Sequence, residues 1–307
     1  MEAPSTGKEK IFVSFNLYLI KDKTFLVTLS LTFFVLMDRK ESFELLTSPQ
    51  NPKIKLVLEL LNSKGRKKHN LFIAEGLREI QIAIKSGFIP TNIFYNSEFI
   101  EKKGTHHFKS FSIPSHQIFE VEKKLFSRFA YREDTEGIAG IFKSRTIDLS
   151  ELELKKNPLI LVLESVEKPG NLGAVLRTAD AAAIDAILIC DPVIDLYNPN
   201  VIRSSIGCIF SQKIIICSSK QAIEWLKKQK ITIYSAALTA NKYYHQVDFR
   251  TSSAIVMGTE ANGLSDIWLK KCDIQIKIPM LGKIDSLNVS NATAIIAYEA
   301  MRQRGFK

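Results

Sequence analysis

The segment IPMLGKIDSLNVSNA, residues 278–292, decides how the C-terminal half of this chain is organised. It starts at the end of a short apolar run, Ile274–Ile278, passes through a polar loop, and leads into helical apolar spacing from Ala292 to Met301. Asn288 and Ser290 are helix-capping residue types at the start of that spacing. The pattern therefore predicts a strand, an irregular loop and a terminal helix, in that order.

Upstream of this segment, apolar runs alternate with helical patterns. Pro158–Leu163 is a continuous apolar run, typical of a strand that is buried on both faces of a parallel sheet. Helical patterns at Leu172–Ala183 and Lys220–Lys230 separate the runs. The alternation predicts an α/β domain with a mostly parallel sheet that helices cover on both faces. The other predicted strands are Ala186–Cys190, Lys213–Cys217, Ile231–Ala236 and Ala254–Gly258.

Residues 48–146 have short strands and helices of their own. A helical pattern at 53–61 is followed by the basic stretch 62–70, which we expect to be a loop, and by a strand at Leu71–Ala74. The chain of 307 residues is longer than one average domain. We therefore predict a small α/β domain at 48–146, a linker at 147–157 and a second domain at 158–307.

The chain is basic, with 42 Lys and Arg against 32 Asp and Glu and a net charge of +10. Residues 48–146 carry 17 basic against 10 acidic residues, and residues 158–307 carry 17 against 13. Basic proteins attract polyanions, so nucleic acid and an anionic membrane surface are candidate partners, and a generally basic solvated surface is the alternative. The first region is the more basic of the two, which suits it to hold a phosphate backbone.

The four cysteines, Cys190, Cys208, Cys217 and Cys272, show no C-x-x-C spacing, and no histidine lies at a metal-ligand offset from them. We interpret them as free thiols in a reducing cytoplasm and predict no metal site.

Residues 1–47 look like an extension of the folded chain. The apolar run Phe25–Met37 is shorter than the roughly 20 residues of a membrane span. Asp-Arg-Lys-Glu follows it, whereas a secretory signal would end in a small-residue cleavage site. We expect residues 1–36 to be disordered or to precede a true start at Met37, and we expect no membrane association.

Three polar segments that contain glycine each follow a predicted strand of the second region. The first, EKPGNLGAVLRTAD at 167–180, places Asn171 at an expected N-cap and Arg177 on the same helix, where both could face one anion site. The second is VMGTEANGLS at 256–265, and the third is 278–292. The signatures of ordinary Rossmann enzymes, P-loop NTPases and α/β-hydrolases are absent.

Together and in this order, the three segments resemble the motifs of the SpoU/TrmH family of SPOUT methyltransferases. The resemblance covers 158–307 and includes NPNVIRSSIG at 198–207. Residues 48–146, with Phe72 and Glu75-Gly76, resemble the substrate-binding domain that precedes the catalytic domain in many members. One departure is Ala183, where many members have glycine.

The resemblance implies a trefoil knot in the C-terminal parallel-sheet domain, a homodimer, and S-adenosylmethionine as the cofactor. By motif position, Gly258, Ile278 and Leu287 would contact the cofactor, largely through backbone atoms. The catalytic set would be Asn171, Arg177, Glu260, Ser286 and Asn288. In the first domain we assign RNA binding to Arg66, Lys67 and Lys68.

The implied activity is 2′-O-ribose methylation of structured RNA, and the basic first domain favours ribosomal RNA. A transfer-RNA 2′-O-methyltransferase and a non-catalytic RNA-binding factor with the same fold are the alternatives. No motif contains a His or Cys base, and the family proposal gives Arg177 that part. Because arginine almost never loses its proton, we prefer phosphate positioning as its role.

Overall fold

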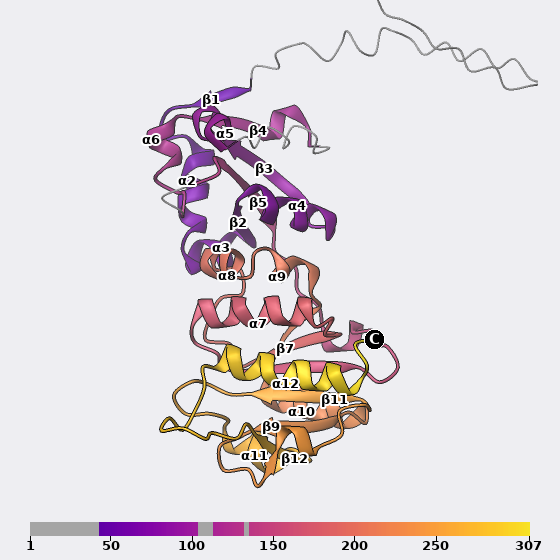
Figure 1. Cartoon of the computed structure of the whole chain (residues 1–307). Coiled ribbons are helices and arrows are strands. Elements are labelled where there is room, and N and C mark those ends of the chain that lie inside the picture. Colours follow the sequence, from indigo (N-terminus) through magenta and orange to yellow (C-terminus); the bar gives the residue numbers. More distant parts are fainter. Residues whose placement is uncertain (1–42, 104–112, 132–134) are drawn as a thin grey trace, which may run out of the picture. The chain divides into compact units, whose positions relative to one another are not determined.

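The computed structural model describes residues 43–103, 113–131 and 135–307 (Figure 1). Phe43–Lys307 forms one compact unit. The apolar run Phe25–Met37 and the predicted start at Met37 lie outside the described residues. Within the described ranges, no helix combines the length and the apolar character that crossing a membrane requires.

The N-terminal domain holds a five-stranded sheet, in the part of the chain described, with the order β1-β4-β3-β5-β2. Strands β1 and β3 run parallel to β4, whereas β5 runs antiparallel to both β3 and β2. The strands are β1 (Glu44–Leu46), β2 (Leu71–Glu75), β3 (Pro90–Tyr95), β4 (Ile118–Val121) and β5 (Ile138–Lys143). The helices are α2 (Pro52–Leu60), α3 (Ser63–His69), α4 (Leu77–Lys85), α5 (Ser97–Lys103) and α6 (Lys123–Phe126), with a 3-10 turn at Ser115–Gln117.

The basic stretch 62–70 is not the loop that we predicted, because Ser63–His69 forms α3. Gly65 allows the two helices to approach each other closely: a Cβ atom there would lie 2.0 Å from the carbonyl oxygen of Glu59 in α2. Asn70, at φ 52°, ends the helix in the left-handed conformation that asparagine tolerates. The helix turns Arg66 inward, away from solvent.

The C-terminal domain holds a seven-stranded sheet with the order β10-β12-β9-β11-β6-β7-β8, and every pairing in it is parallel. The predicted parallel α/β class is confirmed, and the trefoil knot stays a prediction. The strands are β6 (Leu159–Glu164), β7 (Ala186–Cys190), β8 (Ile214–Cys217), β9 (Thr232–Ala236), β10 (Lys242–Tyr243), β11 (Ser253–Met257) and β12 (Ile274–Lys277).

Helices cover both faces of this sheet, as the continuous apolar run of β6 predicts. Leu161 packs into the core beneath α7 (Pro169–Ala181) and α12 (Val289–Gln303). Its neighbour Val162 faces the opposite core, beneath α10 (Ser219–Lys228) and α11 (Asp266–Lys271). The short helices α8 (Pro199–Ser204) and α9 (Cys208–Ser211) follow β7, and a 3-10 turn at Tyr244–Gln246 follows β10.

The segment 147–157, which we predicted to be a linker, packs onto the second domain. Ile147 forms an isolated parallel bridge with Ile215 at the edge of the sheet, and a 3-10 turn covers Leu149–Glu151. Leu152 and Leu154 pack against the core that contains Val162. These residues therefore extend the core of the C-terminal domain.

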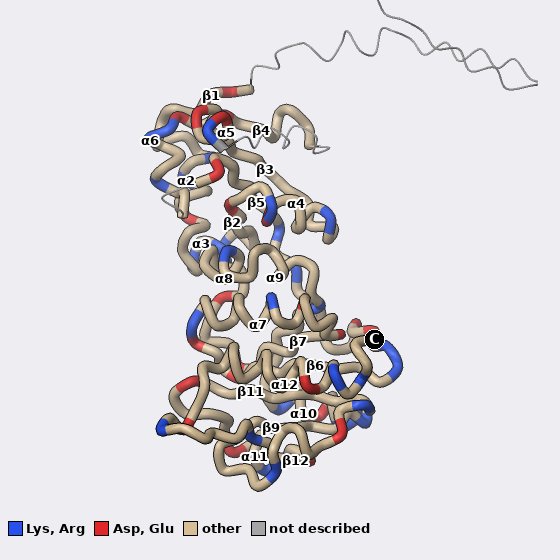
Figure 2. Tube along the Cα trace, viewed as in Figure 1, with Lys and Arg blue, Asp and Glu red and all other residues tan. Residues whose placement is uncertain are grey.

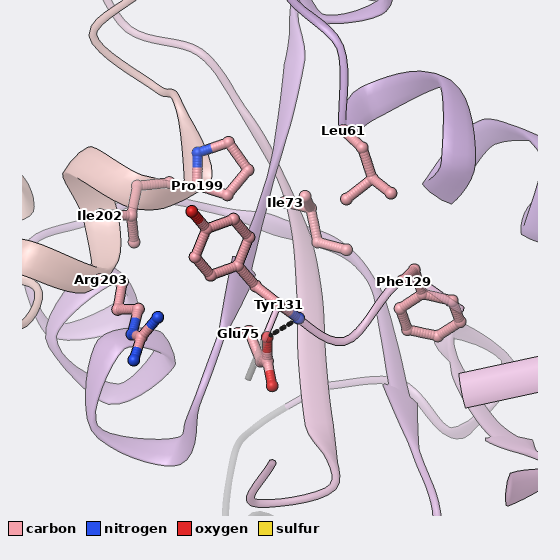
Figure 3. A pocket seen from close by; sticks show the side chains of 8 residues that line it. All are labelled: Leu61, Ile73, Glu75, Phe129, Tyr131, Pro199, Ile202 and Arg203. Carbon is pink, nitrogen blue, oxygen red and sulfur yellow. Dashed lines mark hydrogen bonds between the residues drawn. The ribbon is translucent and has the colours of Figure 1, made fainter. Parts of the chain in front are cut away.

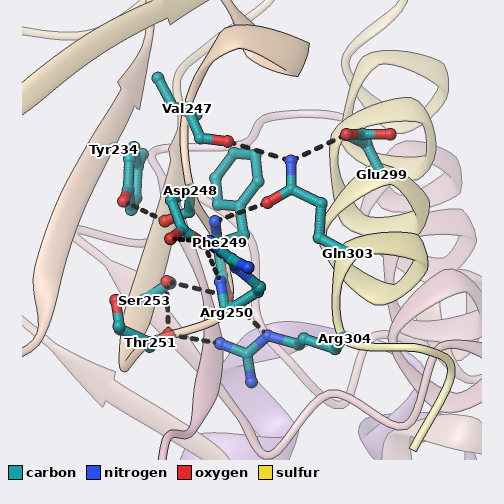
Figure 4. Close-up of polar contacts among 10 residues, drawn as sticks. All are labelled: Tyr234, Val247, Asp248, Phe249, Arg250, Thr251, Ser253, Glu299, Gln303 and Arg304. Carbon is teal, nitrogen blue, oxygen red and sulfur yellow. Dashed lines mark hydrogen bonds and ion pairs between the residues drawn. The ribbon is translucent and has the colours of Figure 1, made fainter.

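The end of α12 is held by one arginine. The Arg304 guanidinium donates hydrogen bonds to the carbonyl oxygens of Phe249 at 2.8 Å, Asn157 at 2.6 Å and Thr251 at 2.6 Å, and Figure 4 shows its contacts with Phe249 and Thr251. Burial lowers the pKa of Arg304, but an arginine keeps its charge in proteins. The last helix is thereby fixed to the segments that precede β6 and β11.

A strained residue, Ala183, lies two positions after the end of α7. Ala183 has φ 49°, a left-handed conformation that costs an L-residue about 1 kcal/mol or more and costs glycine almost nothing. This explains why glycine suits the position in the family that the sequence resembles.

We expect Ala183→Gly to raise the free energy of unfolding by about 0.5–1 kcal/mol, because removing the strain outweighs the added chain entropy of glycine. Urea denaturation of the full chain measures it. The matched control is Ala181→Gly, in the last turn of α7, which should lower the free energy of unfolding by about 0.5–1 kcal/mol. If both variants lose stability, the strain at Ala183 is not real.

Candidate active site

Two neighbouring strands bring the first two motifs to one edge of the sheet. β6 and β11 pair in parallel, with Leu163 opposite Met257. Both strands therefore end at the same edge. The chain continues from β6 into α7 and from β11 into the turn 258–264, so both motifs begin at that edge.

Asn171 lies in the first turn of α7. We predicted it to be the N-cap, but Lys168 takes that place, because Pro169 begins the helix with its preset φ. The Asn171 amide nitrogen donates a hydrogen bond to Glu260 Oε1. Its amide oxygen accepts one from Asn288 Nδ2 at 3.1 Å. Asn171 thus connects the second motif to the third.

Asn288 caps α12, as predicted. Its Oδ1 accepts hydrogen bonds from the Ser290 backbone N–H at 2.9 Å and from Ser290 Oγ at 2.6 Å. Because the cap uses the oxygen of this amide, its nitrogen is left to donate to Asn171. The cap therefore fixes the direction of the whole Asn288–Asn171–Glu260 chain.

Glu260 sits on a tight turn that depends on two glycines. Thr259 and Gly263 exchange backbone hydrogen bonds of 3.0 and 3.1 Å, and Gly263 has φ 67°. A Cβ atom at Gly258 would lie 2.2 Å from the carbonyl carbon of Gly263, so a larger residue there would open the turn. The Gly258 backbone lies where this turn meets β11.

A residue outside the three motif segments anchors the other end of this turn. Glu164, the buried last residue of β6, accepts hydrogen bonds from the Ser265 backbone N–H at 2.8 Å and from the Ser265 hydroxyl. Ser219 Oγ also contacts the carboxylate at 3.4 Å and accepts the Trp268 indole N–H at 2.9 Å. The sequence does contain a signal for this role, because Glu164 is a charged residue at the end of an otherwise apolar strand.

Two members of the predicted catalytic set, Ser286 and Arg177, form none of the hydrogen bonds that join Asn288, Asn171 and Glu260 in the described part of the chain. Ser286 is exposed, and its hydroxyl donates to Asp285 Oδ1 at 2.9 Å. Arg177 is also exposed, and no residue in the described ranges forms a hydrogen bond or ion pair with it. Six helical positions turn a side chain by about 240°, so Arg177 leaves α7 on a different face from Asn171. Asn171 and Arg177 do not contact each other in the described part of the chain, and our expectation that both face one site stays a prediction.

Of the three predicted cofactor residues, Gly258 directly follows β11, Ile278 directly follows β12, and Leu287 directly precedes Asn288. Gly258 is buried, and Ile278 and Leu287 are half-buried. Within the described part of the chain, no backbone group from Pro279 to Leu287 hydrogen-bonds to another backbone group. That loop therefore has free N–H and C=O groups next to Asn288, which fits a ligand held mainly by backbone contacts.

The basic residues of α3 divide into two kinds. The Arg66 guanidinium is buried, donates to Asp195 Oδ2 at 2.6 Å, and donates to the carbonyl oxygens of Leu60 and Leu61 at 2.8 and 2.9 Å. Lys67 is exposed, and Lys68 is exposed beside Glu59 at 3.2 Å. Figure 2 shows the basic residues at α3. Arg66 is a structural residue that joins the two domains, which corrects its assignment to RNA binding.

Comparison with known proteins matches both halves of the chain. Residues 158–298 match the SpoU rRNA Methylase family, and residues 51–140 match the MRM3-like substrate binding domain. The chain is 29% identical over 256 residues to the 23S rRNA (guanosine(2553)-2′-O)-methyltransferase RlmP of Bacillus subtilis, a match that covers 82% of this chain and 96% of that protein.

Solved structures share the fold across both domains. An RNA 2′-O ribose methyltransferase is 34% identical, with a TM-score of 0.71 over 85% of this chain and 99% of the other. An AdoMet-bound rRNA methyltransferase from Sinorhizobium meliloti is 26% identical, with a TM-score of 0.75 over 85% of this chain and 98% of the other.

Arg66→Ala should lower the free energy of unfolding by about 3 kcal/mol, because it removes the cation that pairs with Asp195 Oδ2 and the donor to two carbonyl oxygens. Lys67→Ala is the matched control from the same helix turn and should change stability by less than about 0.5 kcal/mol. Thermal denaturation followed by circular dichroism compares the two. Equal stabilities would show that the Arg66–Asp195 pair does not hold the domains together.

Proposed function

Because this chain belongs to the SpoU rRNA methylase family, we propose that it transfers the methyl group of S-adenosylmethionine to a ribose 2′-oxygen of ribosomal RNA. The observation that carries the proposal is the hydrogen-bonded chain Asn288–Asn171–Glu260, which joins all three motif segments at one sheet edge. The relatives named 23S rRNA 2′-O-methyltransferases favour ribosomal RNA over transfer RNA.

The hydrogen bonds from Asn288 to Asn171 and from Asn171 to Glu260 orient the Glu260 carboxylate. Glu260 Oε1 accepts from Asn171, and no described residue hydrogen-bonds to its Oε2. That oxygen can accept a hydrogen bond from a ribose hydroxyl and aim the hydroxyl oxygen along the line that an in-line displacement needs. S-adenosylmethionine, when bound, supplies the methyl group; Gly258, Ile278 and Leu287 would hold it. Because Asn288 is itself fixed by its cap, the carboxylate is positioned before substrate arrives.

The remaining basic and polar residues would act on RNA. The exposed guanidinium of Arg177 is free to bind a phosphate in the two-pronged geometry that arginine favours. Ser286, two residues before Asn288, would contact the ribose or the cofactor. Lys67 and Lys68 would contact the RNA backbone and make binding depend on salt. We propose that the reaction takes place in the cytoplasm, where ribosomal RNA is available.

Incubating the full chain with labelled S-adenosylmethionine and total cellular RNA, followed by digestion to nucleosides, tests the activity. We expect label in 2′-O-methylnucleosides from ribosomal RNA. Asn171→Asp should lower the rate at least tenfold, because it replaces the N–H donor to Glu260 by a second carboxylate.

Label confined to bases would contradict the proposal, and label in transfer RNA alone would favour the transfer-RNA alternative. RNA binding with no label anywhere would favour the non-catalytic factor. Lys227→Ala, in the last turn of α10, is a control of unchanged activity, because α10 covers the other face of the sheet from α7 and α12.

We propose a homodimer that buries the exposed apolar side chains beside the active site. Leu281 and Ile284, in the loop before α12, are 96% and 62% exposed, and Tyr298 on α12 is 44% exposed. Leu281 and Ile284 lie three residues apart in one loop, and exposed apolar side chains that a partner can cover favour a protein interface.

Replacing both Leu281 and Ile284 by Asp should shift the chain from dimer to monomer in sedimentation velocity, because two carboxylates would be buried at the interface. Leu238→Asp is the control and should leave the mass unchanged; this leucine, in the loop after β9, is 61% exposed, close to the value for Ile284. A monomeric wild-type chain at micromolar concentration would contradict the proposal.

A further inference from the structure

An exposed aromatic side chain lies at the junction between the two domains. Tyr131 is 46% exposed, and the guanidinium carbon of Arg203, at the end of α8, lies 5.5 Å from the centre of its ring. Figure 3 shows the ring facing the residues of α8. We infer that Tyr131 and Arg203 form a platform on which an unpaired base of the RNA substrate stacks.

The N-terminal domain holds Tyr131 in place. The Glu75 carboxylate, at the end of β2, accepts the Tyr131 backbone N–H at 2.6 Å through Oε2 and the Thr135 hydroxyl at 2.6 Å through Oε1. Thr135 is buried, and the Glu75 carboxylate therefore links Tyr131 to a residue inside the domain. The ring is exposed while its backbone is fixed, and a fixed aromatic loses little entropy when a ligand stacks on it.

Arg203 is available to a ligand. Its side chain is exposed, and within the described ranges it forms no hydrogen bond or ion pair. Tyr131 and Arg203 line a small hollow whose apolar walls include Ile73, Phe129 and Ile202. An exposed aromatic ring and a planar cation suit the face of a nucleobase, and the guanidinium can also reach a phosphate.

The platform is next to the proposed catalytic edge. Ser204, the residue after Arg203, donates a hydrogen bond to the Pro169 carbonyl oxygen at 3.2 Å, two residues before Asn171. A base held on Tyr131 would therefore lie close in the RNA to the nucleotide that receives the methyl group. Single-stranded RNA exposes its bases for stacking, whereas a duplex hides them, so the platform would select an unpaired nucleotide.

The inference rests on the proposed RNA substrate, and binding without S-adenosylmethionine tests it separately. The probe is fluorescein-labelled oligoadenylate of about twelve nucleotides, titrated with the full chain and followed by anisotropy. We expect Tyr131→Ala to weaken binding about 5- to 100-fold, Arg203→Ala to weaken it less, and Tyr131→Phe to stay within about twofold of wild type. The matched control, Phe306→Ala, removes an aromatic ring that is 64% exposed and should not change binding.

Unchanged binding by Tyr131→Ala would overturn the platform, as would an equal loss on a duplex of the same length. Methylation kinetics separate this result from the proposed function. If the chain methylates ribosomal RNA and Tyr131→Ala leaves the KM for RNA unchanged, the platform is wrong and the activity stands. If binding depends on Tyr131 but no methyl group is transferred, the activity is wrong and the platform stands.

Discussion

The parallel pairing of β6 and β11 is the constraint on which the site depends. Its register places Leu163 beside Met257, so the two strands end at the same edge of the sheet. Glu164, one residue further along β6, binds Ser265 and closes the far end of the turn that follows β11. A slip in this register would separate Asn171 from Glu260 by several ångströms, because each strand residue advances about 3.3 Å.

Much of this arrangement could be predicted from the sequence. Continuous apolar runs identify buried parallel strands, and polar segments after them collect at one edge, so Asn171, Glu260 and Asn288 could be grouped in advance. The exact start of α7 could not be predicted from capping types alone, because Lys168 and Pro169 supply the cap and the first turn. Arg177 could not be placed either, because a shared helix does not imply a shared face.

Long-range partners explain the other differences. Arg66 looks like an RNA contact in a run of basic residues, but its acceptor Asp195 lies 129 residues further along the chain. Likewise, residues 147–157 resemble a linker in sequence, although their leucines pack against a core that distant strands form. A local sequence pattern contains no information about such distant partners. The burial of a basic residue, or of a residue in an apparent linker, therefore cannot be predicted from it.

Packing between the two domains fixes the position of the proposed RNA-binding residues relative to the proposed catalytic residues. The Phe72 ring stacks on Tyr197 with centroids 4.3 Å apart, and Phe88 meets Phe210 at 5.1 Å, so one aromatic core spans both domains. At the other side of that core, α8 packs so closely on α7 that a Cβ atom at Gly173 would lie 1.9 Å from Ser204 Oγ. Because packed contacts of this kind do not deform gradually, RNA held on the proposed Tyr131 platform would lie at a fixed distance from Asn171 and Glu260. Selection of the substrate by distance would then follow from the close packing between α7 and α8.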